Sequence, residues 1–406
     1  MKKILLIMVA IIAAMTLHAQ TPAFARGGDV SWCTEMEAAG KRFYNVNGQD
    51  TELMELMRQV GMNAIRLRVW VNPETAYGSW SDKTDVLVKA RRAHAQGLAL
   101  LIDFHYSDFF ADPGRQAKPT AWATYSFDEL KQAVANHTRD VLQALKDEGI
   151  EPAWVQVGNE TNSGMIWPSG EIDWQKSGSA RYTSYVALSN AGYDAVKEVL
   201  PEAKVIVHHD KASADNVWFY REFRTAGGKF DVIGLSHYPD WTNWSSDNSS
   251  AARNIQTLGK TFSVPVMLVE TGYSSYDEER AEMVMTDLFN KTRDLTQCAG
   301  IFYWEPEVYG NWKPAYYQTL GWNAYGSGAF TSQGRPSKAL TPFYDATDAI
   351  TLPLEDHHSD ATTTGGDAVS YYELDGRACG SASSLQHRPT VVVAKTAHQV
   401  CKLSVR

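Results

Sequence analysis

Two glutamates, each at the end of a short apolar run, could share acid–base chemistry. Glu160 follows residues 154–159 and Glu270 follows residues 266–269, about 110 residues later. Glycoside hydrolysis needs one carboxyl group as proton donor and a second as nucleophile or base. A single acidic residue at a strand end can simply mark where the chain meets solvent. Two of them, one preceded by Asn159, favour catalysis.

The elements that would position these carboxylates are strands whose C-terminal ends meet at one face. From about residue 27 to 350, β-rich runs alternate with helix-like segments, which is typical of a parallel α/β fold. Eight strands in one such segment predict an α/β fold, a single (β/α)8 TIM barrel with a short C-terminal extension. The expected strands are Gly27–Trp32, Ala64–Val71, Ala99–His105, Trp154–Glu160, Lys204–His209, Val232–Tyr238, Val266–Glu270 and Gly300–Glu305. Helical periodicity predicts helices at Thr51–Val60, Asp85–Gln96 and Phe127–Glu148.

Alternation along each strand predicts which side chains enter the barrel. Arg66, Arg68 and Trp70 share one face of their strand, and arginines would be costly against the helical layer. We therefore expect this face to point inward. The same alternation gives further inward sets, namely Gln156, Gly158 and Glu160; Leu268 and Glu270; Ser236 and Tyr238; and Phe302 and Trp304.

The two ends of the chain differ in composition from the barrel segment. Lys2 and Lys3 precede an apolar stretch and small-residue cleavage sites, so residues 1–25 read as a secretory signal peptide. Residues 26–352 form the expected catalytic domain, and residues 353–406 a linker and short C-terminal tail. Four cysteines, without a Cys-x-x-Cys spacing, argue against a zinc site. Cys379 and Cys401 could pair within the tail.

Charge and aromatic content narrow the class of ligand. The net charge is −9 with no basic run in the mature chain, which argues against nucleic-acid binding. The 13 Trp, 19 Tyr and 14 Phe include many in polar, Gly- and Pro-rich segments. Such rings suit the C–H faces of sugars as well as protein cores. The aromatic content alone is a weak indication of a carbohydrate ligand, because core packing remains the default role for any single ring.

Seven ordered motifs then become specific to one family. They are Gly28-Asp29-Val30-Ser31, Arg66-Leu67-Arg68-Val69-Trp70, the stretch 103–114 (DFHYSDFFADPG), Val157-Gly158-Asn159-Glu160, Gly234-Leu235-Ser236-His237-Tyr238-Pro239, Val269-Glu270-Thr271 and Phe302-Tyr303-Trp304-Glu305-Pro306. In these motifs the chain resembles glycoside hydrolase family 53, the arabinogalactan endo-β-1,4-galactanases, from Gly27 to about Phe343. The resemblance implies a retaining, endo-acting glycosidase that cleaves β-1,4-galactan in pectin side chains.

The resemblance also implies roles for individual residues. Glu160 would be the acid/base and Glu270 the nucleophile. Asn159 would bind the sugar 2-hydroxyl, and Arg66 or Arg68 would hold Glu270 ionised. The remaining residues expected to contact or orient substrate are His105, Asp108, Phe110, Asp112, Tyr238 and Trp304. His105 and Tyr238 could alternatively be satisfied core positions.

Departures from the family pattern bear on affinity and on metals. Phe110 stands where the family commonly has Trp, which reduces the stacking area at that subsite. Bacterial members can bind calcium after the seventh strand, but here the acids of residues 277–279 look like the first turn of a helix. We therefore expect no metal and no cofactor. The triplet His208, His209 and Asp210 suits a substrate wall better than a metal site.

Two rival functions and the cellular location complete the expectations. Another endo-acting enzyme of the same clan, such as a mannanase or xylanase, would share both glutamates, but the loop at residues 108–114 favours a galactanase. A binding protein that has lost catalysis would not need both glutamates with their Asn, Arg and Trp partners. We expect a monomer, exported to the periplasm, cell surface or medium, without membrane insertion after signal cleavage.

Overall fold

The structure, a computed structural model, describes residues 21–344, 370–373, 390–395 and 400–405. Contacts divide the chain into two units, Met1–Asp348 and Ala349–Arg406. Most of the expected signal peptide, the linker and Cys379 therefore lie outside the described residues. In the second unit, β11 (Ser370–Glu373), β12 (Thr390–Lys395) and β13 (Val400–Val405) form an antiparallel sheet. These three strands lie within residues 353–406, the segment expected to form the linker and short C-terminal tail.

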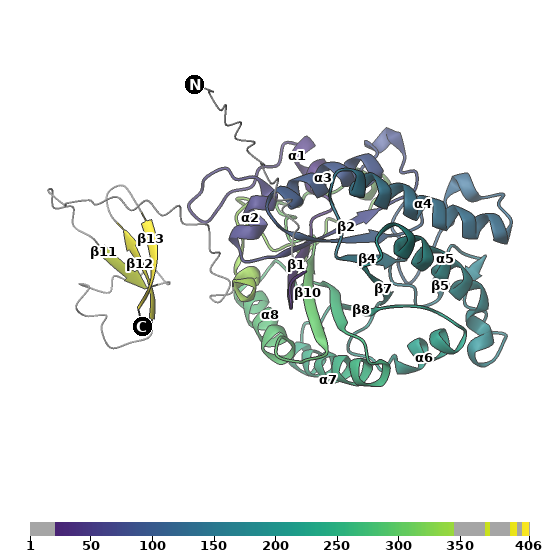
Figure 1. Ribbon diagram of the computed structural model, residues 1–406. Coiled ribbons are helices and arrows are strands. Elements are labelled where there is room, and N and C mark those ends of the chain that lie inside the picture. The colour runs from purple at the N-terminus through teal and green to yellow at the C-terminus, as the bar shows by residue number, and fades with distance from the viewer. Residues whose placement is uncertain (1–20, 345–369, 374–389, 396–399, 406) are drawn as a thin grey trace, which may run out of the picture. The chain divides into compact units, whose positions relative to one another are not determined.

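The first unit is built on a closed barrel of eight parallel strands, seen in the centre of its helices in Figure 1. Around the barrel the strands run in the order β1-β10-β9-β8-β7-β4-β3-β2. Their bounds are β1 Ala25–Asp29, β2 Ala64–Val69, β3 Ala99–Phe104, β4 Trp154–Val157, β7 Lys204–His209, β8 Val232–His237, β9 Val266–Thr271 and β10 Cys298–Trp304. The predicted TIM barrel is thereby confirmed.

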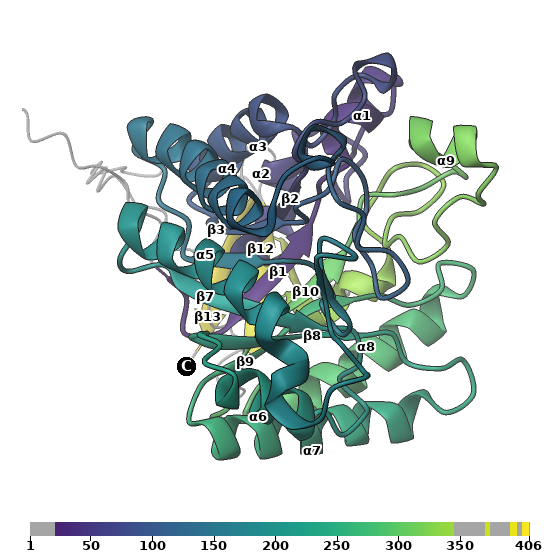
Figure 2. The same ribbon diagram turned by 90° about the vertical axis from the view of Figure 1, so that its right-hand side faces the viewer.

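Helices cover the outside of the barrel, with α4 packed on α5 and α7 on α8 (Figures 1 and 2). The helices are α1 Cys33–Ala38, α2 Leu53–Gln59, α3 Lys83–Ala95, α4 Phe127–Asp147, α5 Thr183–Val199, α6 Val217–Thr225, α7 Trp244–Phe262, α8 Glu278–Thr292 and α9 Ala315–Leu320. The 3₁₀ turns are η1 Thr75–Tyr77, η2 Thr120–Trp122, η3 Gly178–Tyr182 and η4 Lys338–Phe343, and β5 (Gly164–Met165) pairs with β6 (Gly170–Glu171). The three helices expected from periodicity lie within two residues of α2, α3 and α4. A capping box between Ser126 and Glu129 fixes the start of α4.

Two apolar layers follow from the alternation of side chains along the strands. One layer lies between strands and helices and contains Ile65, Leu67 and Val69. The other fills the barrel interior, with members that include Ala64 and Phe302. Above this interior apolar layer, the inward-facing positions carry polar side chains. Arg66 and Arg68 lie on the same face of β2 as the interior residue Ala64, so their expected inward direction is confirmed. The interior apolar layer gives the site above it a rigid base.

A β-bulge in β9 overturns one expectation about inward side chains. Leu235 pairs with Leu268 but Ser236 pairs with Glu270, so β9 has one extra residue at this point. Leu268 belongs to the helix-facing layer, whereas Val269 belongs to the interior layer. Leu268 and Glu270 therefore do not share a face, as strict alternation predicted. The extra residue resets the alternation and aims Glu270 into the barrel mouth.

Strand β1 also differs from its expected bounds, starting and ending earlier than Gly27–Trp32. Ala25 is fully buried and pairs with Gly300 of β10, and Phe24 packs edge-on against Phe289. The chain turns after Asp29, whose side chain accepts a hydrogen bond from the backbone N–H of Ser31.

Within the described part of the chain, no helix is long and apolar enough to cross a membrane.

Candidate active site

Glu160 stands in a tight turn directly after β4. Gly158 has φ +87°, where a Cβ atom would meet the Thr161 side chain at 2.6 Å, so the turn requires glycine. Glu160 itself has φ +45°, a conformation that non-glycine residues rarely adopt. Its backbone N–H donates to His208 Nδ1 at 3.2 Å, and Gln116 Nε2 donates to its carbonyl at 3.2 Å. The surroundings hold this carboxyl group in one place.

A hydrogen-bond relay reaches the Glu160 carboxyl from His208. Gln156 Nε2 donates to His208 Nδ1 at 3.0 Å, so the ring proton sits on Nε2. His208 Nε2 then donates to Ser236 Oγ at 2.8 Å, and Ser236 Oγ donates to Glu160 Oε1 at 2.6 Å. Burial and the nearby Arg66 hold the pKa of His208 well below its usual range, so the imidazole is neutral.

Glu270 accepts two hydrogen bonds at the mouth of the barrel. Arg66 Nη2 donates to Oε1 at 2.9 Å, and the Tyr238 hydroxyl donates to Oε2 at 3.1 Å. The Glu270 side chain is almost buried, while the Tyr238 ring remains 45% exposed. A guanidinium and a phenol on its two oxygens favour the ionised form of Glu270.

Burial raises the pKa of both carboxyl groups, but by different amounts. For Glu160 burial is reinforced by the negative charge of Glu270, and the Ser236 hydroxyl opposes the rise, so its pKa lies well above its usual range. For Glu270 the rise from burial is opposed by the Arg66 cation and by the Tyr238 hydroxyl. The environments push the two groups apart, with Glu160 as the acid and Glu270 as the carboxylate.

Arg66 is the charged centre beneath the site. It is fully buried, and Nη1 donates to Asp29 Oδ2 at 2.6 Å. Nη2 lies 2.8 Å from Asp103 Oδ2, 2.8 Å from Asn159 Oδ1 and 2.9 Å from Glu270 Oε1. With no exposed surface, Arg66 orients Glu270 and Asn159, and direct contact with substrate is closed to it.

Arg68 pairs with Glu305 and not with Glu270. Of the two arginines that the sequence left open, Arg66 is therefore the one that bonds Glu270. Its guanidinium pairs with the buried carboxylate of Glu305 and lies 4.7–5.2 Å from the rings of Trp32, Trp70 and Phe110. Arg68 is itself buried. It therefore stabilises an aromatic cluster beside the site.

That aromatic cluster includes Trp304, at the end of β10. The Trp304 ring lies 5.3 Å from Trp32, 6.3 Å from Phe110 and 4.7 Å from Tyr325. In the barrel order β10 lies next to β9, which carries Glu270, and across from β4, which precedes Glu160. Further rings in contact with Trp32 are Trp312 and Tyr317.

The loop after β3 holds the other predicted residues, mostly through bonds to backbone. His105 is buried, its Nε2 donates to Asp103 Oδ2 at 2.9 Å, and its Nδ1 accepts from Ala111 N–H at 2.9 Å. Both ring nitrogens of His105 are thus satisfied, as in the core alternative. The carboxylate of Asp108 accepts from the N–H groups of Asn72 (3.0 Å) and Thr120 (2.8 Å).

Asp112 and Asn159 have comparable local partners. Asp112 Oδ1 accepts from Gly114 N–H at 2.8 Å, which closes a turn of the loop. Asn159 Nδ2 donates to the Ala111 carbonyl at 2.8 Å, and the side chain is 5% exposed. Hydrogen bonds through Arg66 and His208 therefore join Glu160, Glu270, Asn159 and Tyr238 in one network. Trp304 belongs to the aromatic cluster, and Asp108 and Asp112 shape the loop after β3.

Several partners of the two glutamates were missing from the sequence-derived site. Asp29 and Asp103 were not singled out, although both occupy inward positions one strand from Arg66. His208 and Ser236 were noted without a role beside Glu160. An alternation count extended to every strand would have found Asp29 and Asp103. Within the described residues, no group of three His, Cys, Asp or Glu side chains is arranged to hold a metal ion.

Comparison with known proteins agrees with this geometry. The model of glycosyl hydrolase family 53 matches residues 25–343. An endo-β-1,4-galactanase of Bacillus subtilis (strain 168) is 30% identical over 342 residues, covering 75% of this chain and 75% of that protein. An arabinogalactan endo-β-1,4-galactanase of Thermothelomyces thermophilus is 28% identical and covers 78% of this chain and 98% of its own length. A solved fungal β-1,4-galactanase superposes with a TM-score of 0.68 at 28% identity, over 79% of this chain and 99% of the other.

Proposed function

The chain belongs to glycosyl hydrolase family 53, and we propose that it is an endo-acting, retaining β-1,4-galactanase. The single observation that carries the proposal is the opposite environment of two neighbouring carboxyl groups. Among the described residues, the Glu160 carboxyl group accepts a hydrogen bond from a neutral hydroxyl, that of Ser236, whereas the Glu270 carboxyl group pairs with the buried cation of Arg66. One barrel mouth thus offers a proton donor and a carboxylate nucleophile.

In the proposed mechanism, Glu160 protonates the glycosidic oxygen while Glu270 attacks the anomeric carbon. The bond to the leaving sugar breaks and a covalent glycosyl-enzyme forms on Glu270. Glu160 then takes a proton from a water molecule whose oxygen attacks the anomeric carbon. The bond to Glu270 breaks, and the sugar is released with retained configuration. Ser236, donating to Oε1 of Glu160, leaves the other oxygen of this carboxyl free to carry the proton. The hydrogen bond from Arg66 holds the Glu270 carboxyl group in position during both steps.

Substrate recognition follows from the aromatic cluster and the polar rim. Trp304, with Phe110 behind it, provides a stacking surface at the cleavage subsite. Asn159 reaches the 2-hydroxyl of the sugar bound there, and Tyr238 both orients Glu270 and borders the subsite. The natural substrate would be the β-1,4-galactan side chains of pectin.

The experiment that tests the function is release of reducing ends from linear β-1,4-galactan, with mannan, xylan and cellulose beside it. We expect activity on galactan alone, lost in Glu270→Gln, and products of retained anomeric configuration by NMR. Activity on another polymer instead of galactan would show that the proposed substrate is wrong. Binding of galactan without hydrolysis would favour the non-catalytic rival.

We also propose export of a monomeric mature protein, based on the basic and apolar N-terminus. The sequence offers two small-residue cleavage sites, His18-Ala19-Gln20 and Ala23-Phe24-Ala25, and the structure bears on which of them is cut. Cleavage after Ala25 would remove a buried residue that pairs with Gly300 in β1. Cleavage after Ala19 would leave β1 intact, so N-terminal sequencing of the mature protein should start near Gln20.

A further inference from the structure

Two tryptophans expose their rings side by side, away from the aromatic cluster at Trp304. Trp174 is 50% exposed and Trp218 is 44% exposed. Their ring centroids lie 6.2 Å apart with an angle of 55° between the planes. Arg181 lies 5.4 Å from the Trp174 ring, against the same pair. Apolar side chains that are exposed next to one another can mark a binding surface, whereas single scattered ones need no explanation.

The pair lies on the Glu160 side of the barrel opening. Trp174 belongs to the segment between β6 and η3, which follows β4, and Trp218 is the second residue of α6, which follows β7. Strands β4 and β7 are neighbours, so both tryptophans extend from the strand ends next to Glu160.

A chain of contacts connects the pair with the acid/base. Trp218 contacts Phe219 at 6.1 Å, and Phe219 contacts His209 at 4.9 Å. His209 follows His208, whose ring accepts the Glu160 N–H. The leaving sugar must lie next to the proton donor. A polymer chain that continues past the leaving sugar on this side meets the segments that follow β4 and β7, which carry Trp174 and Trp218.

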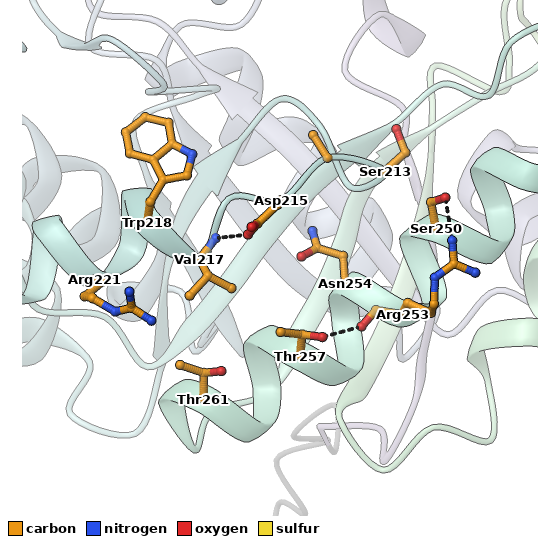
Figure 3. A pocket seen from close by; sticks show the side chains of 11 residues that line it. Ser213, Asp215, Val217, Trp218, Arg221, Ser250, Arg253, Asn254, Thr257 and Thr261 are labelled. Carbon is orange, nitrogen blue, oxygen red and sulfur yellow. Dashed lines mark hydrogen bonds between the residues drawn. The ribbon is translucent and has the colours of Figure 1, made fainter.

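A polar groove continues from Trp218 along the outside of the barrel. It is a hollow of about 640 Å³ between α6 and α7. Figure 3 shows Trp218 and Arg221 on α6 at one side of the hollow, and Arg253, Asn254 and Thr257 on α7 at the other. Its other lining residues include Ser213, Asp215, Ser250 and Thr261. Hydroxyl, amide and guanidinium groups beside one indole ring are the chemistry that binds a neutral sugar chain.

The charges of the groove are compatible with this ligand. Asp215 Oδ1 accepts a hydrogen bond from the N–H of Val217, the first residue of α6, at 3.1 Å. Arg253 donates to Ser250 Oγ at 2.9 Å, and neither Arg221 nor Arg253 is in an ion pair among the described residues. Guanidinium donors free of carboxylates can bond sugar hydroxyls.

We propose that Trp174, Trp218 and the α6–α7 groove form a distal galactan-binding surface on the leaving-group side. The inference rests on the proposed galactanase function and adds where the polymer continues beyond the cleavage point. It gives the enzyme a preference for long chains over short ones.

The test compares polymer with a short substrate. For Trp174→Ala and Trp218→Ala, the ratio of kcat/KM on galactan to kcat/KM on an aryl galactobioside should fall about three- to tenfold each, the loss of one stacking contact. The change should lie in KM. The matched control is Met283→Ala, on α8, where the side chain is equally exposed at 51%. Its ratio should stay at the wild-type value.

Binding to the inactive Glu270→Gln protein separates the ligand from the reaction. Affinity electrophoresis in galactan should show retardation that Trp218→Ala reduces, with no retardation in polygalacturonate. An unchanged ratio in both Trp variants overturns the distal surface, even if galactan is cleaved. Retardation by polygalacturonate instead overturns the choice of a neutral chain. Failure of the wild-type enzyme on galactan would refute the proposed function itself.

Discussion

Removing one hydroxyl group, in Tyr238→Phe, tests how the charge of Glu270 is maintained. The hydroxyl donates to Glu270 Oε2 at 3.1 Å, and this bond favours the ionised carboxylate. The ring is 45% exposed, so its loss of a hydroxyl leaves no buried cavity. Arg66 still donates to the other oxygen, so the variant weakens the stabilisation of the charge without abolishing it.

The size of the effect follows from the hydrogen bond that is lost. A hydrogen bond to a charged group contributes about 1.5–3 kcal/mol. Because Arg66 still donates to the other oxygen of Glu270, we take the lower end of this range. About 1.4 kcal/mol equals about one pKa unit. With less support for the charged form, the pKa of Glu270 rises. Since Glu270 must be ionised to attack, the acid limb of kcat/KM moves to higher pH by about one unit.

The assay is the pH dependence of kcat/KM on an aryl galactobioside, measured beside galactan. Tyr273→Phe is the control, because its hydroxyl donates to the Trp241 carbonyl at 3.2 Å and touches no carboxylate. We expect the acid limb to move in Tyr238→Phe and to stay in Tyr273→Phe. An acid limb that stays, or moves to lower pH, would refute the assignment of Glu270 as the ionised nucleophile.

Four further outcomes are expected. Glu160→Gln should lose about a hundredfold or more on galactan while sparing the first step on an aryl substrate with a good leaving group; equal losses on both would contradict the acid role. Ser236→Ala removes the donor to Glu160, so the pKa of Glu160 rises and the alkaline limb moves to higher pH, which the same pH profile measures. Arg68→Met leaves the Glu305 charge buried and unpaired, and chemical denaturation should show a loss of about 3–5 kcal/mol. Treatment with EDTA should leave Tm unchanged, and a fall that calcium alone reverses would contradict the metal-free prediction.

The strained backbone at Glu160 is held in place by hydrogen bonds from neighbouring side chains. A positive φ at a non-glycine residue costs of the order of 1–3 kcal/mol and persists only where the surroundings enforce it. Gln116 and His208 supply that enforcement through the backbone of residues 159 and 160. The result is a carboxyl group that needs no rearrangement before it donates a proton.

Sequence periodicity predicted the barrel well because its signal is local. Eight apolar runs separated by helical segments leave few other ways to bury both layers. The helices at α3 and α4 were found within two residues for the same reason. Strand ends were less accurate, since the chain leaves β4 at Gly158 through a turn that apolar content does not reveal.

Residue type and spacing alone determined the two glutamates, the inward arginine row and the likeness to one hydrolase family. The tertiary structure alone decided which arginine serves Glu270, because Arg66 and Arg68 alternate identically along β2. It alone revealed the bulge that turns Glu270 inward and the relay from His208 through Ser236 to Glu160. These features depend on strands that meet only when the barrel closes, and the pKa difference between acid and nucleophile arises from that closure.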